Sequence, residues 1–411
     1  MGRALSSIAK PPSVADPRLF INTTIPWSFF VCGLQGSGKS HSTSALLESC
    51  LIPTPILGHL QKPLSGLILH YSQYATASAF QPCEAAFLSV PHPDFAAHQR
   101  HRVPVTVLVS PSNYYNLKTA YAGIPGVTVK RLLLHPAQLN ISAMLALMAV
   151  DTGDKIPLYM SQIQQILRDI AEESRVFDYR DFVEKLDQMN FTKSQRGPLE
   201  QRMSLLESFL DLEADEDPEP LFSDQEGSMT IIDLSCPFVD ESLACVMFDI
   251  CLGLFLSTPS VGKVVAVDEA HKYITNTPGS RELTNSLLSL IRQQRHFGVR
   301  TIISTQEPTI DPRLIELSNV TLMHRFTSPE WFARLKRHIG IGQDHKHGTH
   351  LAEQDLFSKI VNLRTGEAYA FAPSAMAAGE DGLEKLGGRL LKVKTRKRVT
   401  WDGGRSILSV D

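Results

Sequence analysis

The chain has 411 residues, of which 43% are hydrophobic and 20% charged, so it is long and apolar enough to bury a sizeable core. Its formal net charge of -3 excludes the strongly basic composition that would indicate nucleic-acid binding by itself. Six cysteines, none in a C-x-x-C pair, predict buried reduced thiols, which suit an intracellular protein of the cytoplasm or nucleus. No membrane segment is expected, because the longest apolar run, 243–256, contains Asp249 and is too short to span a bilayer.

The first half of the chain begins with a predicted N-terminal arm, residues 1–26, which contains four prolines. Residues 27–32 are apolar and predict a buried strand that runs into a glycine-rich loop, and a helix is expected to follow from Lys39. Further core strands are predicted at 67–70, 103–109 and 127–134.

Residues 141–210 differ in character, because their apolar residues recur at helical spacing. One such face comprises Ile163, Ile166, Leu167 and Ile170. We predict an all-helical insertion here. An acidic loop, 211–228, is expected to follow, since 211–219 hold six carboxylates in nine residues and read as a solvated segment.

Alternating strands and helices resume after the acidic loop. The predicted strands are 229–234, 264–267, 299–304 and 320–324, and the predicted helices are 239–256 and 281–296. This alternation predicts an α/β fold with a largely parallel, doubly wound sheet. The predicted core comprises residues 27–140 and 229–372, and residues 373–411 form a C-terminal basic extension.

Residues 33–40 form the strongest motif of the chain and read G-L-Q-G-S-G-K-S, a full G-x-x-x-x-G-K-S pattern. Glycines let backbone N–H groups converge on phosphate oxygens, and the N-terminus of the following helix adds positive potential. Lys39 is expected to reach the β- and γ-phosphates, and Ser40 to offer its hydroxyl to Mg²⁺, so ATP and Mg²⁺ are the predicted ligands. The residues predicted to bind the nucleotide are Gly33, Gly36, Ser37, Gly38, Lys39, Ser40 and His41.

A second motif is the pair of acids that ends the apolar strand at 263–267. Asp268 is predicted to support the metal together with Ser40. Glu269 is predicted to act as general base on the attacking water. Asp268–His271 also spells the DEAH box of helicases, but about 85 residues follow the last clear core strand, too few for a second RecA-like domain. His271 is therefore expected on a helix surface.

Two further polar groups follow the acidic pair. Gln306 ends the strand that begins at Val299, where its amide can bond the γ-phosphate or the attacking water. Arg295 lies just upstream and is a candidate to stabilise charge on the transferring phosphoryl group. Alternatively, Arg295 is a solvated residue whose charge complements the dipole at the C-terminus of a helix.

Residues 264–325 resemble the HerA/FtsK superfamily of P-loop ATPases, particularly its HerA-like branch. The matching segments are D-E-A-H at 268–271, R-Q-Q-R-H-F-G-V at 292–299, T-Q at 305–306, I-I-D-L at 231–234 and L-R-T-G-E-A at 363–368, which resembles the family's closing hairpin. The resemblance implies a RecA-like P-loop NTPase that forms a ring, expected to be a hexamer, and translocates DNA. It further implies that Gln306 is the γ-phosphate sensor and that Arg295 is an arginine finger for the neighbouring subunit.

The chain departs from the family pattern at two places. HerA proteins carry an N-terminal β-barrel, and about 26 residues precede the first core strand here, so no barrel is expected. The strand after the phosphate loop usually ends in an acid, whereas here it ends L-H-Y-S at 69–72.

The C-terminal segment 392–398 carries five positive charges in seven residues, and three interpretations stay open for it. It can contact phosphates or serve nuclear import, it can form an edge strand protected by lysines, or it can reach a neighbouring subunit's nucleotide. For the whole chain, the leading prediction is a DNA-translocating ATPase. The alternative is a nucleotide-dependent switch or assembly ATPase that does not translocate.

Overall fold

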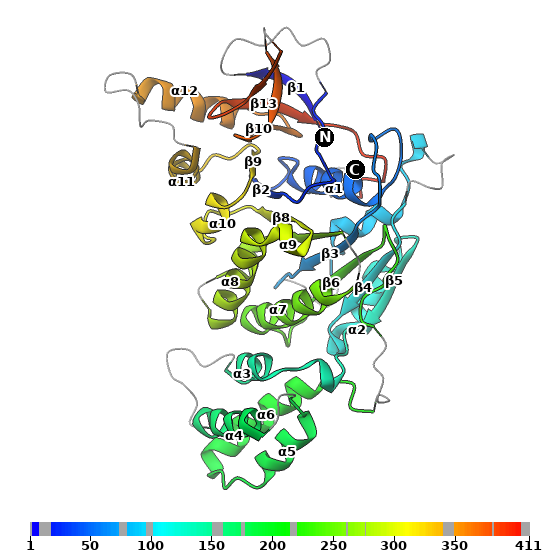
Figure 1. Ribbon diagram of the computed structural model, residues 1–411, viewed down its shortest axis with the longest axis vertical. Helices are drawn as coiled ribbons and strands as arrows, with labels where there is room; N and C mark the ends of the chain where they lie inside the picture. The colour runs from blue at the N-terminus through cyan, green and yellow to red at the C-terminus, as the bar shows by residue number, and fades with distance from the viewer. Residues whose placement is uncertain are drawn as a thin grey trace, which may run out of the picture.

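The computed structural model describes residues 2–7, 18–73, 80–95, 102–149, 159–173, 177–213, 220–259, 262–275, 277–339, 349–379 and 382–403. An eleven-stranded sheet runs through these residues, in the order β1-β13-β10-β9-β2-β8-β7-β3-β6-β4-β5 (Figure 1). Within the described residues, no helix combines the length and the apolar character needed to cross a bilayer. All six cysteines are buried and free, as the sequence predicts.

The strands from β9 to β5 pair in parallel and confirm the predicted sheet. Their bounds are β9 (Val320–Met323), β2 (Ser28–Cys32), β8 (Val299–Thr305), β7 (Lys263–Val267), β3 (Ser65–His70), β6 (Met229–Asp233), β4 (Val105–Val109) and β5 (Val127–Arg131). Parallel strands bring their carboxyl ends to one edge of the sheet. The segment predicted at 127–134 differs in one respect: β5 is shorter and forms the edge of the sheet, so Thr128, Lys130 and Arg131 are exposed.

Alternation along the buried strands explains why helices cover both faces of the sheet. Phe29 and Val31 of β2 pack into one apolar layer, whereas Phe30 and Cys32 pack into the opposite layer. The first layer is shared with α1 (Lys39–Leu51) and α2 (Tyr114–Tyr121), and the second with α7 (Glu241–Ser257) and α8 (Pro278–Arg292). Because both of its faces are apolar, β2 lies between two layers of helices.

The remaining short elements complete the core. The helices are α9 (Gln294–Phe297), α10 (Pro312–Glu316), α11 (Pro329–Ile339) and α12 (Thr349–Val361). The 3₁₀ turns are η1 (Glu84–Ser89), η2 (Pro93–Phe95), η3 (Pro111–Asn113), η4 (Pro136–Gln138) and η5 (Ala270–Lys272), and a separate hairpin pairs β11 (Met376–Gly379) with β12 (Gly382–Lys385).

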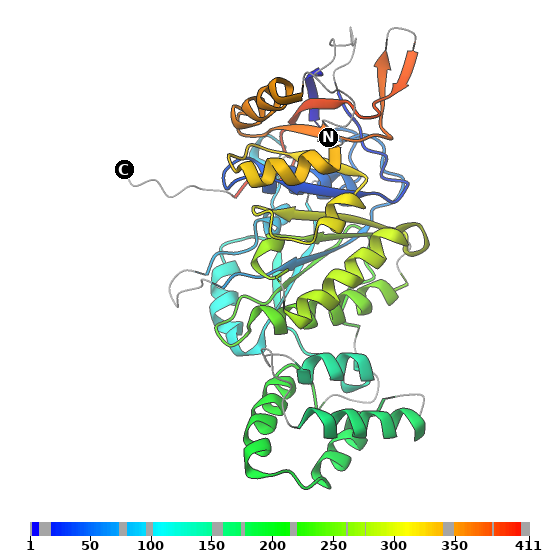
Figure 2. The ribbon, with the colours of Figure 1, turned by 90° about the vertical axis from the view of Figure 1, so that its left-hand side faces the viewer.

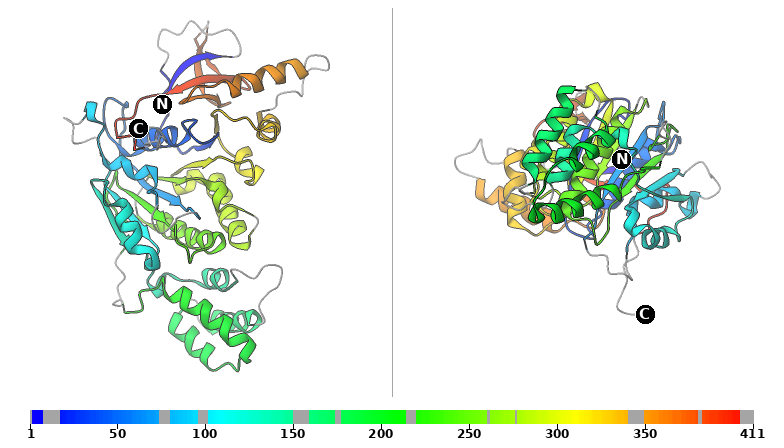
Figure 3. Two further views of the ribbon diagram at one scale, coloured as in Figure 1. Left: turned by 180° about the vertical axis from the view of Figure 1, so that it is seen from behind. Right: turned by 90° about the horizontal axis from the view of Figure 1, so that it is seen from below.

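The described residues between 141 and 210 form the helices α3 (Ile141–Ala149), α4 (Met160–Glu173), α5 (Tyr179–Asp187) and α6 (Lys193–Glu207). Ile163, Ile166 and Ile170 are buried along one face of α4, as their spacing predicts. In Figures 2 and 3 these helices, coloured teal to green, lie at the far end of the molecule from β1 and β13. Of the acidic loop that follows, residues 214–219 lie outside the described residues.

Both ends of the chain add antiparallel strands to the main sheet. β10 (Glu367–Phe371) pairs with β9, β13 (Leu390–Thr395) pairs with β10, and β1 (Gly2–Ser7) pairs with β13. The residues treated as an N-terminal arm and a C-terminal extension therefore include strands of this sheet. Local patterns do not reveal β1 as a strand of this sheet, because its partner β13 lies almost four hundred residues later in the chain. β13 is not an edge strand, because β1 covers its outer side.

The segment that follows β13 lies against α1 and uses its arginines there. Arg396 and Arg398 form ion pairs with the carboxylate of Glu48, and the backbone N–H of Thr400 donates to the same carboxylate over 2.9 Å. Glu48 is fully buried and Arg398 is 1% exposed. Lys397 pairs with Asp94, and Lys392 with Glu367. Most of the charges at 392–398 are thus engaged within the chain.

We expect Glu48→Gln to lower the free energy of unfolding by about 3–5 kcal/mol, because it removes the buried counter-charge of Arg398 and leaves only the half-exposed Asp402 at 3.8 Å. Urea unfolding at neutral pH measures the effect. Asp94→Asn is the matched control, since Asp94 forms an exposed ion pair with the same segment and its loss is expected to change stability little. Equal stabilities of the two variants would contradict a stabilising role for Glu48.

Candidate active site

The glycine-rich loop lies between the carboxyl end of β2 and the start of α1. Gly33, Gly36 and Gly38 have φ angles of 151°, 70° and 103°, which side chains other than glycine rarely adopt. A Cβ atom on Gly38 would lie 2.7 Å from the backbone nitrogen of Gly366, and one on Gly33 would lie 2.7 Å from the Cβ of His324. Both conformation and space therefore require glycine at these two positions.

Two distant segments hold this loop in shape. The N–H of Gly366 donates to the carbonyl of Ser37 over 3.0 Å, and the Thr365 hydroxyl donates to the carbonyl of Gly36 over 3.2 Å. The N–H of Leu34 donates to the carbonyl of Arg325 over 2.9 Å. The turn at 363–368, the segment that resembles a closing hairpin, thus contacts the phosphate loop directly.

Lys39 begins α1 and is almost completely buried beside the loop. Its ammonium donates to the carbonyl of Leu34 over 3.2 Å, an interaction that a phosphate oxygen can replace. Burial lowers the pKa of Lys39, and the charges of Glu269 and Asp268 act in the opposite direction. The next residue, Ser40, bonds the side chain of Glu84 at the start of η1, and burial raises the pKa of that carboxyl group.

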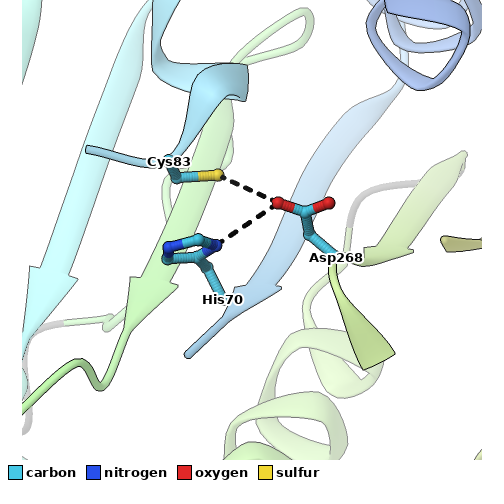
Figure 4. A group of neighbouring side chains, drawn as sticks. All are labelled: His70, Cys83 and Asp268. Atoms are coloured by element: carbon cyan, nitrogen blue, oxygen red, sulfur yellow. Dashed lines mark hydrogen bonds and ion pairs between the residues drawn. The ribbon is translucent and has the colours of Figure 1, made fainter. Parts of the chain in front are cut away.

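Asp268 follows β7 and meets two side chains from neighbouring segments (Figure 4). Its Oδ2 lies 3.3 Å from Nδ1 of His70, which ends β3, and 3.9 Å from Sγ of Cys83, which precedes η1. Burial opposes ionisation of Asp268, but the hydrogen bond and charge of His70 outweigh it and lower the pKa of the carboxyl group. The end of β3, where the family usually has an acid, therefore carries a histidine that forms a hydrogen bond with Asp268.

Glu269 and Gln306 are brought together at the ends of β7 and β8. Nε2 of Gln306 donates to Oε2 of Glu269 over 2.7 Å. Among the described residues other than glycine, Glu269 alone has a positive φ, 49°. Such a conformation is costly and occurs preferentially at functional sites.

His271 does not lie on a helix surface, so that expectation was wrong. Its side chain is 11% exposed, Nδ1 lies 3.5 Å from Oε2 of Glu269, and the same nitrogen accepts from the N–H of Gln306 over 3.3 Å. Burial lowers the pKa of His271 despite the nearby charge of Glu269. A neutral imidazole can accept that hydrogen bond, which ties the ends of β7 and β8 together.

These residues fit a nucleoside triphosphate with Mg²⁺. The loop offers glycine backbone at three positions with positive φ and an ammonium group beside it. Mg²⁺ prefers oxygen ligands, and Ser40 and Asp268 supply a hydroxyl and a partly exposed carboxylate, both of which interact with Glu84. Mg²⁺ would neutralise charge on the β- and γ-phosphates.

Two residues predicted for this site, His41 and Arg295, do not join the group around Asp268 and Glu269. The imidazole of His41 contacts Oδ2 of Asp402 and the carbonyl of Arg396, each at 2.9 Å, so the C-terminal segment engages both ring nitrogens. Arg295 is exposed on α9, just before β8, whereas Gln306 follows the other end of that strand. Seven strand residues separate the two ends by about 20 Å, so Arg295 does not reach the phosphate loop of its own chain.

His324 gives stability a pH dependence, because burial beside the phosphate loop lowers its pKa to about 4. The unfolded chain takes up this proton as the pH falls below about 6.5, whereas the folded chain resists uptake until about pH 4. The free energy of unfolding therefore decreases by up to about 3 kcal/mol as the pH falls from 6.5 to about 4. Urea unfolding at pH 7 and pH 4.5 should show a smaller loss for His324→Asn than for the parent protein, and equal losses would contradict this assignment.

Sequence reasoning missed several residues of this site. His70 could be noticed only as the residue at a strand end that lacks an acid, and Cys83 and Glu84 belong to no motif. His324 follows β9 and stands within no recognisable pattern.

No protein-family model matches the chain, and no curated protein sequence matches it. Among solved structures, VirB4 of Thermoanaerobacter pseudethanolicus is similar with a TM-score of 0.55 and 11% identity, over 96% of each chain. The bacterial conjugative coupling protein TrwBΔN70 has a TM-score of 0.44 and 13% identity, over 98% of this chain and 92% of its own. The genome packaging NTPase B204 of Sulfolobus turreted icosahedral virus 2 has a TM-score of 0.33 and 9% identity, over 91% and 98%.

The likeness to VirB4 extends over almost the whole of both chains and concerns the fold. The phosphate loop after β2 and the acidic end of β7 stand at the same edge of this parallel sheet. The chain thus has an α/β, RecA-like P-loop NTPase fold.

Proposed function

We propose that the protein is an ATP- and Mg²⁺-dependent motor ATPase of the HerA/FtsK type, which assembles into a ring, expected to be a hexamer, and translocates DNA. The observation that carries the hydrolytic part is the convergence of Lys39, Asp268, Glu269 and Gln306 at one edge of the sheet. A phosphate-binding lysine, a metal-supporting acid and a base beside a positioning amide are the groups that phosphoryl transfer to water requires.

In this proposal each side chain has one task. Lys39 and the loop N–H groups bind the β- and γ-phosphates, and Ser40 and Asp268 hold Mg²⁺. Glu269 accepts the proton of the attacking water, and Gln306 keeps that carboxylate and the water in line through its amide. The hydrogen bond between Gln306 and Glu269 supports this division.

Lys39→Ala tests nucleotide binding. We expect the variant to fold, as circular dichroism and gel filtration would report, and to lose measurable ATP affinity in calorimetry. Lys359→Ala is the matched control, since Lys359 is a half-exposed lysine paired with Asp355 on α12. Normal ATP affinity in a folded Lys39→Ala protein would refute the assignment of the phosphate loop.

A tyrosine–arginine cluster supports nucleic acid as the partner; it comprises Tyr114, Tyr115, Lys118 and Arg131. The Arg131 guanidinium lies 4.2 Å from the ring centre of Tyr114 and 5.7 Å from that of Tyr115, which is 74% exposed. Exposed aromatic rings beside cations bind bases by stacking and phosphates by charge. The cluster lies at the carboxyl end of β5, which is an edge strand of the sheet among the described residues.

DNA binding tests this part of the proposal. Loss of one stacking contact is worth about 1–3 kcal/mol, so Tyr115→Ala should weaken single-stranded DNA binding by about 5- to 150-fold, measured by fluorescence anisotropy. Thr119→Ala, on the same helix as Tyr115, serves as control. Unchanged DNA affinity of Tyr115→Ala would remove the cluster from the proposal.

The second candidate is a nucleotide-dependent switch or assembly ATPase that does not move DNA. The internal pairing of Arg396 and Arg398 with Glu48 favours it, because these two arginines are not available as DNA contacts. ATP turnover measured with and without DNA separates the two candidates. Stimulation by DNA supports the motor, whereas nucleotide-dependent assembly without DNA stimulation supports the switch.

A further inference from the structure

Three metal-binding side chains converge at one point beside the phosphate loop, and no motif of the sequence unites them. His70 comes from the end of β3, Cys83 from the segment before η1, and Asp268 from the end of β7. Figure 4 shows the imidazole and the thiol both directed toward the carboxylate. One ligand atom of each residue lies within 4.8 Å of the other two.

The distances are close to those of a tetrahedral metal centre. Bond lengths of about 2.0–2.1 Å to nitrogen, 2.0–2.2 Å to oxygen and 2.3 Å to sulfur give edges of about 3.3–3.6 Å. The edge between Nδ1 of His70 and Oδ2 of Asp268 is 3.3 Å, and the edge between Sγ of Cys83 and the same oxygen is 3.9 Å. Sγ of Cys83 thus lies about 0.3 Å farther from this oxygen than a tetrahedral edge requires, and all three ligand atoms lie within 4.8 Å of one another.

The donor set selects the ion. Mg²⁺ takes oxygen ligands, whereas nitrogen and thiolate sulfur favour Zn²⁺ and related transition metals. His70 and Cys83 are buried, which keeps water from competing, and the side chain of Asp268 is 15% exposed, which leaves a route for the ion and a fourth position for water. Three protein ligands with one open position are a common zinc arrangement.

We propose that His70, Cys83 and Asp268 form a binding site for Zn²⁺ or a similar transition-metal ion, and that the ion inhibits ATP turnover. The inhibition rests on the proposed function, because Asp268 is also the acid assigned to Mg²⁺. An ion held between the imidazole and the thiolate occupies the carboxylate oxygen on the His70 side and draws Asp268 away from the nucleotide. Binding itself does not depend on that function.

Direct metal binding to the full chain without nucleotide tests the site, with Co²⁺ as spectroscopic probe and Zn²⁺ as competitor. We expect one Co²⁺ per chain, with the visible bands of a tetrahedral ion and a sulfur-to-cobalt charge-transfer band that Zn²⁺ removes. Cys83→Ser should abolish the charge-transfer band and weaken Zn²⁺ binding by at least about 100-fold, since even outer-shell changes cost 10- to 100-fold.

Two further variants test whether metal binding depends on these particular residues. His70→Gln keeps an amide able to bond Asp268 but removes the imidazole, and it should also lose the tetrahedral bands. Cys236→Ser is the control, because Cys236 is a buried thiol whose sulfur lies 3.3 Å from the Ser112 hydroxyl rather than beside a histidine and an acid. Its metal binding should match that of the parent chain.

The outcomes separate the site from the function. A Co²⁺ complex without sulfur ligation, or equal Zn²⁺ affinity in Cys83→Ser and the parent chain, would overturn the proposed site and leave a hydrogen-bonded cluster around Asp268. If the site binds Zn²⁺, chelator-reversible inhibition of ATP turnover that is weaker in Cys83→Ser supports the inhibitory role. Full turnover with Zn²⁺ bound overturns that role, and a chain that binds Zn²⁺ but never hydrolyses ATP contradicts the proposed function instead.

Discussion

Replacing Glu269 by glutamine is expected to slow ATP turnover by about 10²–10⁴-fold while ATP still binds. The amide is close in size to the carboxylate but cannot accept the proton of the attacking water. The hydrogen bonds that hold the phosphate loop are not altered by the change, because they are made with Arg325, Thr365 and Gly366. The strained backbone at Glu269, with φ at 49°, holds this one side chain toward Gln306.

Single-turnover hydrolysis and ATP affinity, measured separately, test this role of Glu269. Glu307→Gln is the matched control, since Glu307 is the next carboxylate after Gln306 and its side chain is exposed. We expect it to retain most of the turnover rate. Near-normal turnover of Glu269→Gln, or a larger loss for Glu307→Gln, would transfer the base role to Glu307.

Replacing Arg295 by alanine is expected to lower turnover of the assembled protein by about 10³-fold or more, with much less change in ATP affinity. The physical reason is position. Arg295 is exposed and lies about 20 Å of strand away from Gln306, so a role in phosphoryl transfer would require the nucleotide of a neighbouring subunit. Arg292→Ala is the comparison, because Arg292 ends the preceding helix α8 and is also exposed.

Mixing subunits decides whether Arg295 acts in trans. Arg295→Ala subunits keep an intact phosphate loop, and Lys39→Ala subunits keep an intact arginine, so neither is expected to hydrolyse ATP alone. Mixtures that co-assemble should regain part of the activity where an intact loop faces an intact arginine. Co-assembled mixtures without activity would exclude Arg295 from a neighbour's site and remove the main mechanistic support for a ring.

The sequence alone determined the features that depend on neighbouring residues. The phosphate loop at 33–40 combines a strand, glycines and a helix start within one short segment, so its pattern is visible without the fold. The strands ending at Asp268 and Gln306 were recognised in the same way, from apolar runs followed by polar groups. Helical spacing in 141–210 likewise predicted helices, because each apolar face repeats locally.

Only the tertiary structure decided which distant residues meet. Asp268 contacts His70 across 198 positions because β3 and β7 are neighbours in the sheet, and strand order is not written in any local pattern. The contact between Gly366 and the phosphate loop and the burial of Arg398 against Glu48 also join residues that are far apart in the sequence, so no local pattern predicts them. A run of charges has the same sequence whether it faces solvent or a buried carboxylate, and packing alone distinguishes the two cases.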